Sequence, residues 1–175
     1  MRTNSTRHIT PMLAVSIALA VLSLACTCSP CGLLENIPAG TTSSQPQFET
    51  SAGTMTIAQV ELADSFPPGC SSGPACNHAK EGYQVLIVWL ERADGGSIRE
   101  VDDELFGETL PHMTGDAEIS VADADGTTSS LAITHIDDDN DQFALVFAVQ
   151  DTARDFTFTW LDNPPIELER PTVQP

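Results

Sequence analysis

The stretch that decides the fold is a nearly unbroken apolar run, Tyr83-Gln84-Val85-Leu86-Ile87-Val88-Trp89-Leu90. A run this short and this rich in β-branched residues predicts a central strand whose two faces are both covered by other parts of the chain. Turn-forming residues bound it, with prolines, glycines and serines at 67–76 before it and Asp94-Gly95-Gly96 after it. The chain therefore contains at least one buried strand around which a sheet can assemble.

Short strands separated by turn signals are expected on both sides of this run. In 54–62, alternate residues from Thr56 to Leu62 are expected to share one face, and 123–126 has the composition of a hairpin turn. The further expected strands are 119–121, 131–136, 142–149, 156–160 and 166–168. About seven or eight short strands predict an all-β domain, an antiparallel β-sandwich.

One short helix is expected in a connection at 97–106. Ser97 and Glu100 have the spacing of a capping box. Apolar residues at 98, 101 and 105 recur at helical spacing. The segment is short and acidic, so we expect one or two helical turns at most.

The first 25 residues have the three parts of a signal peptide in order. Arg2 and Arg7 come first, an apolar run from Met12 to Ala25 follows, and Cys26 comes next. A helix of this length spans about 21 Å, which is short of a hydrocarbon core of about 30 Å. We therefore expect residues 1–25 to be removed on export, and we do not expect a permanent transmembrane helix.

The segment Leu22-Ser23-Leu24-Ala25-Cys26 resembles the lipobox of bacterial lipoproteins. That resemblance implies that Cys26 becomes the first mature residue and carries acyl chains such as palmitate, which anchor the protein to a membrane. An ordinary secreted protein is the alternative, because Ser23 and Ala25 also satisfy the small-residue rule for cleavage at the same bond. The expected location is extracytoplasmic, at the cell surface or in the periplasm, or secreted if Cys26 is not acylated.

The chain has 175 residues and a formal net charge of −18, and Lys80 is its single lysine. This charge repels nucleic acid and anionic lipid, so neither is expected as an electrostatically recruited partner. After the leader, 26–47 is rich in Ser, Thr, Pro and Gly and is interpreted as a flexible tether. Residues 48–170 are then the β domain, and 171–175 are a C-terminal tail.

Five cysteines are present, an odd number for an exported protein. Assigning Cys26 to a lipid leaves four, and proximity pairs Cys70 with Cys76 and Cys28 with Cys31 as disulfides. Cys28-x-x-Cys31 also has the spacing of a redox pair or of metal ligands, although a redox pair usually lies after a strand at a helix N-terminus. A structural disulfide, a thiol–disulfide function and metal ligation all stay open for these two residues.

Two loops are rich in acidic residues and supply candidate calcium ligands. These ligands are Asp123 and Asp125 in one loop and Asp137, Asp139 and Asp141 in the other. Calcium takes about 6–8 oxygen ligands, so this composition suits it. The alternative is an ordinary solvated hairpin loop, because Asp and Asn favour turn geometry by themselves.

Several of these segments together resemble the telokin-like, immunoglobulin-fold domain of bacterial lipoproteins and secreted mycobacterial immunogenic antigens. The resemblance is carried by Glu81-Gly82-Tyr83 leading into the apolar strand, by Asp123-x-Asp125-Gly126, and by the segments 143–149 and 156–168. It covers about residues 48–170 and implies an Ig-like sandwich. The 70–76 loop and the acidic segment 99–108 depart from the pattern. The family has no assigned catalytic residues, so none is transferred to this chain.

These features predict a non-catalytic interaction, structural or small-ligand-binding module, whose partner is an envelope protein or a small ligand. No enzyme is expected, because no phosphate-binding glycine-rich loop is present and the histidines are scattered over separate segments. No cofactor is expected apart from calcium. Two other functions stay open: a calcium-dependent adhesion or binding module that uses the acidic loops, and an extracytoplasmic thiol–disulfide protein that uses Cys28 and Cys31.

Overall fold

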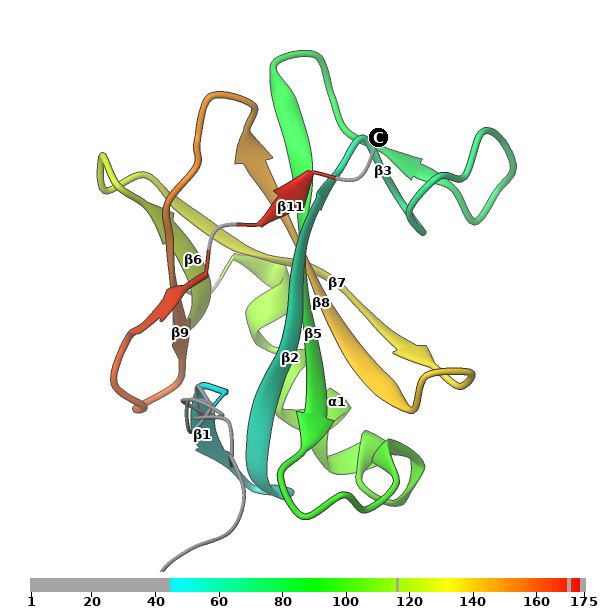
Figure 1. The fold of residues 1–175 in the computed structure, drawn as a ribbon, viewed down its shortest axis with the longest axis vertical. Helices are drawn as coiled ribbons and strands as arrows, with labels where there is room; N and C mark the ends of the chain where they lie inside the picture. The colour runs from blue at the N-terminus through cyan, green and yellow to red at the C-terminus, as the bar shows by residue number, and fades with distance from the viewer. Residues whose placement is uncertain (1–44, 116, 170, 174–175) are drawn as a thin grey trace, which may run out of the picture. The chain divides into compact units, whose positions relative to one another are not determined.

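The fold is built around the apolar run, which is the strand β5 (Tyr83–Arg92) of a computed structural model (Figure 1). The structure describes residues 45–115, 117–169 and 171–173. Strand β5 pairs antiparallel with β2 (Gly53–Ala63) on one side and with β8 (Gln142–Gln150) on the other. Its side chains alternate between two hydrophobic clusters, with Leu86, Val88 and Leu90 in the main core and Val85, Ile87 and Trp89 in a second cluster. The predicted strand with two covered faces is therefore confirmed.

Eight strands form one curled antiparallel sheet. Their order is β1 (Gln47–Thr50), β2, β5, β8, β7 (Thr128–Asp137), β6 (Ile119–Asp123), β9 (Phe156–Trp160) and β10 (Ile166–Leu168). The first residues of β7 pair with β6, whereas residues 131–137 pair with β8, so β7 belongs to both halves of the sheet. The all-β antiparallel prediction is confirmed, and the two halves are continuous through β7.

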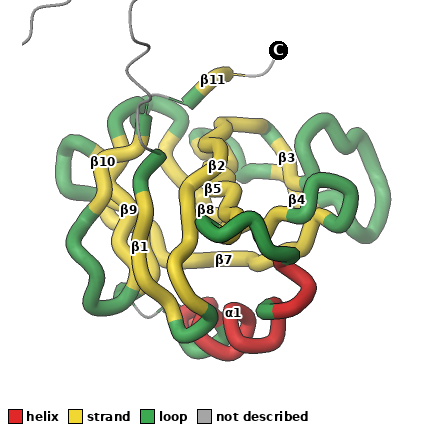
Figure 2. The backbone as a smooth tube through the Cα atoms, turned by 60° about the horizontal axis from the view of Figure 1, so that its bottom comes forward, coloured by secondary structure: helices red, strands yellow, loops and turns green. Residues whose placement is uncertain are grey.

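The two ends of the curled sheet meet through side chains. The ring of Phe48 in β1 lies 5.4 Å from that of Phe158 and 5.2 Å from that of Trp160, both in β9. Asn163, after β9, accepts a hydrogen bond from the Glu49 amide at 3.0 Å and donates one to the Glu49 carbonyl at 2.8 Å. The tube view places β1 beside β9 (Figure 2). The main core is enclosed by this curl, because both halves of the sheet turn an apolar face inward.

Strand β2 differs from the expected alternation. A β-bulge between Ile57 and Gln59 inserts one residue, so Met55 and Ile57 before it and Val60 and Leu62 after it all contact the main core. The prediction that Thr56 and Ala58 share a face with Leu62 is therefore wrong. A bulge reverses the side-chain parity of the strand beyond it.

The expected helix at 97–106 is two shorter pieces, η1 (Ile98–Glu100) and α1 (Asp102–Thr109), and η2 (His112–Thr114) follows them. Ser97 is the predicted N-cap, because its hydroxyl accepts a hydrogen bond from the Arg99 amide at 3.3 Å. Glu100 does not complete a capping box. Its carboxylate pairs with Arg92 at 2.9 Å, so the ion pair takes the place of the reciprocal cap.

A small second sheet carries the predicted disulfide between Cys70 and Cys76, whose Cα atoms lie 5.8 Å apart. Its strands are β3 (Ser65–Phe66) and β4 (Asn77–His78), and neither was expected from the sequence.

A last strand, β11 (Thr172–Val173), pairs parallel with β2 and lies in the segment interpreted as a tail. Within the described ranges, no helix has the length and apolar content needed to span a membrane. The leader 1–25, the tether up to residue 44, Cys26, Cys28 and Cys31 lie outside those ranges.

Candidate functional site

A cavity of about 410 Å³ opens on the face of the sheet opposite the main core. Its floor is apolar and comes from three neighbouring strands: Val85 in β5, Val146 in β8 and Ile133 in β7. Small side chains at Ala132 and Ala148 widen it, and both residues are exposed. This size falls within the range of about 300–1,000 Å³ that is usual for small-ligand pockets.

The wall of this cavity is the β3–β4 hairpin. Phe66 in β3 is 3% exposed, and its ring lies 6.4 Å from that of Trp89 and 5.4 Å from that of His135. The Ala79 amide donates to the Asp64 carbonyl at 2.9 Å, which ties the end of β4 to the end of β2. The disulfide closes the loop between the two strands. These contacts hold the wall against the sheet although each of its strands has only two residues.

Polar residues also line the cavity, and all of them except the half-buried Gln84 are exposed and form its rim. His78, Lys80 and Tyr83 line it and are exposed, and Tyr83 is the largest exposed aromatic side chain of the described residues, at 46%. The Tyr83 amide donates to the Lys80 carbonyl at 2.9 Å, in a turn where Gly82 has φ +80°. The turn needs a left-handed backbone conformation at this position, which glycine adopts without a steric penalty. The turn fixes Lys80 and Tyr83 beside the entrance of the cavity.

The charge at this rim differs from that of the rest of the chain. Among the described residues that line the cavity there is no Asp or Glu, although the chain has 25 of them, and its single lysine is one of these residues. The other described cations are engaged elsewhere: Arg92 and Arg99 pair with carboxylates, and Arg154 donates to backbone carbonyls. Among the described residues, the Lys80 side chain has no ion-pair partner. The cavity thus combines an apolar floor with one uncompensated positive charge.

The candidate calcium ligands fall into two separate turns at opposite ends of β7 (Figure 1). Asp123 accepts hydrogen bonds from the amides of Asp125 and Thr127 at 3.0 and 2.8 Å. Asp137 accepts from the amides of Asp139 and Asn140. Hydrogen bonds of this kind are typical of aspartates that stabilise turns. They fit the alternative to calcium binding, in which each loop is an ordinary solvated hairpin loop.

The two turns do not combine into one metal site. None of the described His, Cys, Asp and Glu residues form a group of three or more that is arranged to hold a metal ion. The Asn140 side chain donates to Asp137 at 2.8 Å, and this bond is the main reason why the pKa of Asp137 is lowered. Calcium binding at either turn remains an untested alternative, and it is set against the hydrogen bonds that these aspartates already accept.

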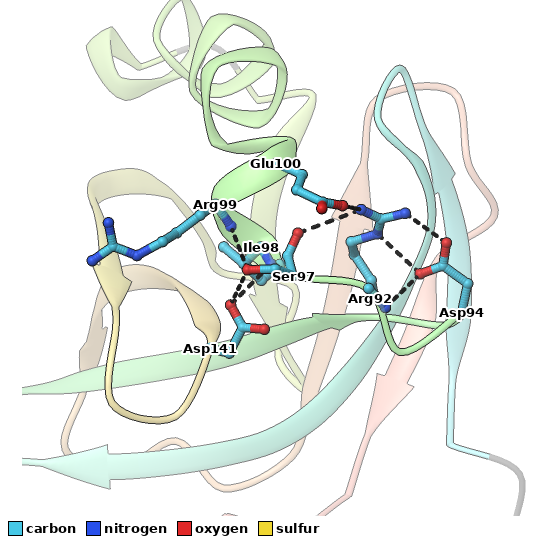
Figure 3. Close-up of polar contacts among 8 residues, drawn as sticks. Arg92, Asp94, Ser97, Ile98, Arg99, Glu100 and Asp141 are labelled. Atoms are coloured by element: carbon cyan, nitrogen blue, oxygen red, sulfur yellow. Dashed lines mark hydrogen bonds and ion pairs between the residues drawn. The ribbon is translucent and has the colours of Figure 1, made fainter.

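A polar cluster around Arg92 joins the end of β5 to η1 and to the turn after β7 (Figure 3). The guanidinium contacts Asp94 at 2.9 and 2.6 Å and Glu100 at 2.9 Å. The Asp94 hydrogen bond, followed by that of Glu100, raises the pKa of Arg92, and the same contact with Arg92 lowers the pKa of Asp94. On the other side of η1, Asp141 accepts from the Ser97 hydroxyl at 2.9 Å and from the Ile98 amide at 3.0 Å. The cluster is structural, because these contacts tie the end of β5, η1 and the turn after β7 to one another.

One serine pattern was missed by the sequence reasoning. Residues 69–73, Gly-Cys-Ser-Ser-Gly, match the spacing of the nucleophile elbow of α/β-hydrolases. That elbow lies between a strand and a helix, whereas this pattern lies in the disulfide loop between β3 and β4. The nearby contact of His78 Nε2 is with Cys76 Sγ at 3.3 Å, a sulfur already used in the disulfide. The local structure does not support a serine nucleophile here.

Comparison of the chain with protein-family models, curated proteins and solved structures finds no match.

The cavity was not predicted from the sequence. Its lining comes from β3, β4, β5, β7 and β8, which are separate segments of the chain. Two sequence signals bear on it: the single lysine at position 80 and the apolar character of both faces of β5 and β8. The second signal is informative because an apolar outer face needs a cover or a ligand.

Proposed function

We propose that this protein is a non-catalytic small-ligand-binding module that works outside the cytosol, held to a membrane by acyl chains on Cys26. The observation that carries the binding function is the cavity of about 410 Å³ beside the disulfide hairpin. Its apolar floor and few polar rim groups have the composition of a ligand pocket.

The proposed location is supported by the leader at 1–25 and by the Cys70–Cys76 disulfide, since disulfides persist mainly in oxidising compartments. The mass of the mature N-terminal peptide tests the anchor. We expect cleavage before Cys26 and an acyl adduct on it, and a Cys26→Ser variant that leaves the membrane fraction. An unmodified N-terminal peptide, or an intact leader on a cytosolic protein, would contradict the proposal.

A binding function is preferred over catalysis because of where the polar groups lie. His78, Lys80 and Tyr83 stand at the rim and are exposed to water, whereas the floor carries only aliphatic side chains. Catalytic groups usually meet the substrate inside a water-excluded site. The arrangement therefore suits retention of an apolar molecule.

Titration with the uncharged apolar dye Nile red tests binding in the cavity. We expect saturable binding to the purified protein, with a blue shift of the dye emission. Ala148→Trp places a large ring in the cavity and is expected to weaken binding by about tenfold or more, or about 1.4 kcal/mol. Ala124→Trp, the same exchange at an exposed turn position outside the lining, serves as the control.

Two outcomes would refute this function. One is absence of saturable dye binding to a folded protein. The other is equal affinity of the wild type and the Ala148→Trp variant, which would place the dye elsewhere. Melting curves of both tryptophan variants show whether each is folded, so loss of binding through unfolding is recognised.

A further inference from the structure

We infer that the ligand of this cavity is an anionic amphiphile, a molecule with an aliphatic chain and a carboxylate, and that Lys80 binds the carboxylate at the rim. The inference rests on the proposed binding function and specifies its ligand class. The aliphatic part fits the floor made by Val85, Ile133 and Val146, which offers no hydrogen-bonding side chain.

Charge complementarity argues for the carboxylate. The chain has a net charge of −18, so an anion is repelled over most of its surface. The cavity lining is an exception, because the part of it that the structure describes has no acidic residue and contains the single lysine. Glu81 follows Lys80 and is exposed, but it is not part of the lining. An ammonium without an ion-pair partner among the described residues can pair with a ligand anion without breaking an existing contact.

The position of Lys80 is set by backbone contacts on both sides. The Ala79 amide is bonded to the Asp64 carbonyl, and the Lys80 carbonyl accepts from the Tyr83 amide. The lysine therefore lies where the hairpin wall meets the start of β5, while its side chain is exposed. An ion pair at such an exposed place is weak, so it selects among ligands and adds little to total affinity.

Displacement of Nile red by matched ligands tests the inference. Decanoate, decanol and decyltrimethylammonium share one chain and differ in head-group charge. We expect decanoate to bind about two- to fivefold more tightly than decanol, and the cation to bind most weakly. Octanoate is expected to bind roughly fifteenfold more weakly than decanoate, since it has two fewer methylenes and each buried methylene contributes about fourfold.

Variants of Lys80 connect this preference to the rim. Lys80→Gln is expected to abolish the preference for decanoate over decanol, Lys80→Arg to keep it, and Lys80→Glu to reverse it. Arg99→Gln removes the same charge from an exposed position outside the lining and is expected to leave the preference unchanged. The difference between wild type and Lys80→Gln should shrink as salt rises, because exposed ion pairs are screened.

The result also separates this inference from the proposed function. Nile red binding with equal affinity for decanoate and decanol, or an unchanged preference in Lys80→Gln, would overturn the anionic ligand class and leave the cavity as a binding site. An affinity independent of chain length would overturn burial of the aliphatic chain. Absence of both dye and decanoate binding would refute the proposed function itself.

Discussion

The indole nitrogen of Trp160 donates a hydrogen bond to Glu108 Oε2 at 3.0 Å, which links β9 to the helix α1. The other oxygen of the same carboxylate accepts from the Ser51 amide at 2.5 Å, in the turn between β1 and β2. One side chain thus satisfies donors from two separate segments. Trp160 is 1% exposed, so its N–H has little access to water as a replacement partner.

Replacing Glu108 by alanine is expected to lower the free energy of unfolding by about 1–3 kcal/mol, because a buried donor then loses its acceptor. Glu108→Gln keeps one acceptor oxygen and is expected to lose less. Urea unfolding followed by Trp160 fluorescence, in a Trp89→Phe background, measures both. Glu104→Ala on the same helix is the control, since Glu104 is exposed. Equal losses for Glu104→Ala and Glu108→Ala would contradict the bridging role.

Gly96 is expected to be needed for the Arg92 cluster. A Cβ on Gly96 would lie 2.5 Å from Arg92 Cζ, so Gly96→Ala has to displace the guanidinium from Asp94 and Glu100. We expect a loss of at most about 1 kcal/mol in the free energy of unfolding, because the displaced group is the end of a flexible side chain and its ion-pair partners are exposed.

A double-mutant cycle with Arg92→Ala measures this coupling. In that background the steric conflict is gone, and Gly96→Ala is expected to be neutral or slightly stabilising. The same cost of Gly96→Ala in both backgrounds would show that the clash with Arg92 is not its cause.

Loss of the Cys70–Cys76 disulfide is expected to lower the free energy of unfolding by about 2 kcal/mol, the chain-entropy value for so short a loop. It should also weaken Nile red binding, because the loop joins the two strands of the cavity wall. Urea unfolding and dye titration of the Cys70→Ser/Cys76→Ser variant measure the two effects. A reductant should destabilise the wild type and have a smaller effect on this variant. Unchanged stability of both would contradict the prediction.

Acidification is expected to remove the stabilising contribution of the Asp137 carboxylate. Hydrogen bonds, first of all from the Asn140 side chain, lower the pKa of Asp137 in the folded protein. The unfolded state therefore binds a proton more readily, and the contribution is complete above the ordinary pKa of about 3.9 and lost as pH falls through the lower folded value.

Urea unfolding of the wild type and of Asp137→Asn at several pH values tests the direction of this pH dependence. The stability difference between the two proteins should be largest near neutral pH and should narrow below about pH 4. A difference that grows on acidification would show that the folded pKa is raised instead.

Calcium is expected to leave the melting temperature unchanged relative to a chelator. The carboxylates of Asp123, Asp137 and Asp141 already accept hydrogen bonds from backbone amides, which a bound cation would have to replace. Thermal melts with millimolar calcium and with chelator provide the comparison. An increase in melting temperature that disappears in Asp137→Asn would establish a metal site at that turn.

Local patterns were sufficient for the long strands. Strands β5, β8 and β9 were correctly predicted as strands. The pattern that identifies each one, a continuous apolar run in β5 and alternating apolar residues in β8 and β9, lies within the strand itself. Ser97 was predicted as an N-cap for the same reason. The short strands β1, β3, β4 and β11 were missed, because they have too few residues for a periodic pattern, whereas the equally short β10 was predicted at 166–168.

The bulge in β2 could not be inferred from the pattern either. Its extra residue is fixed by the register against β5, and this register sets which side chains of β2 face the core. Glu100 likewise has the spacing of a capping-box residue in the sequence, but it does not take that role. The ion pair with Arg92 formed because the end of β5 lies beside η1 in the folded chain.

The sequence by itself determined the all-β class, the central position of β5 and the pairing of Cys70 with Cys76, because each depends on residues that are close along the chain. Only the tertiary structure decided that Lys80 borders an apolar cavity and that Glu108 joins Trp160 to Ser51. Those relationships unite residues that are tens of positions apart, and the curling of one sheet about β7 brings them together.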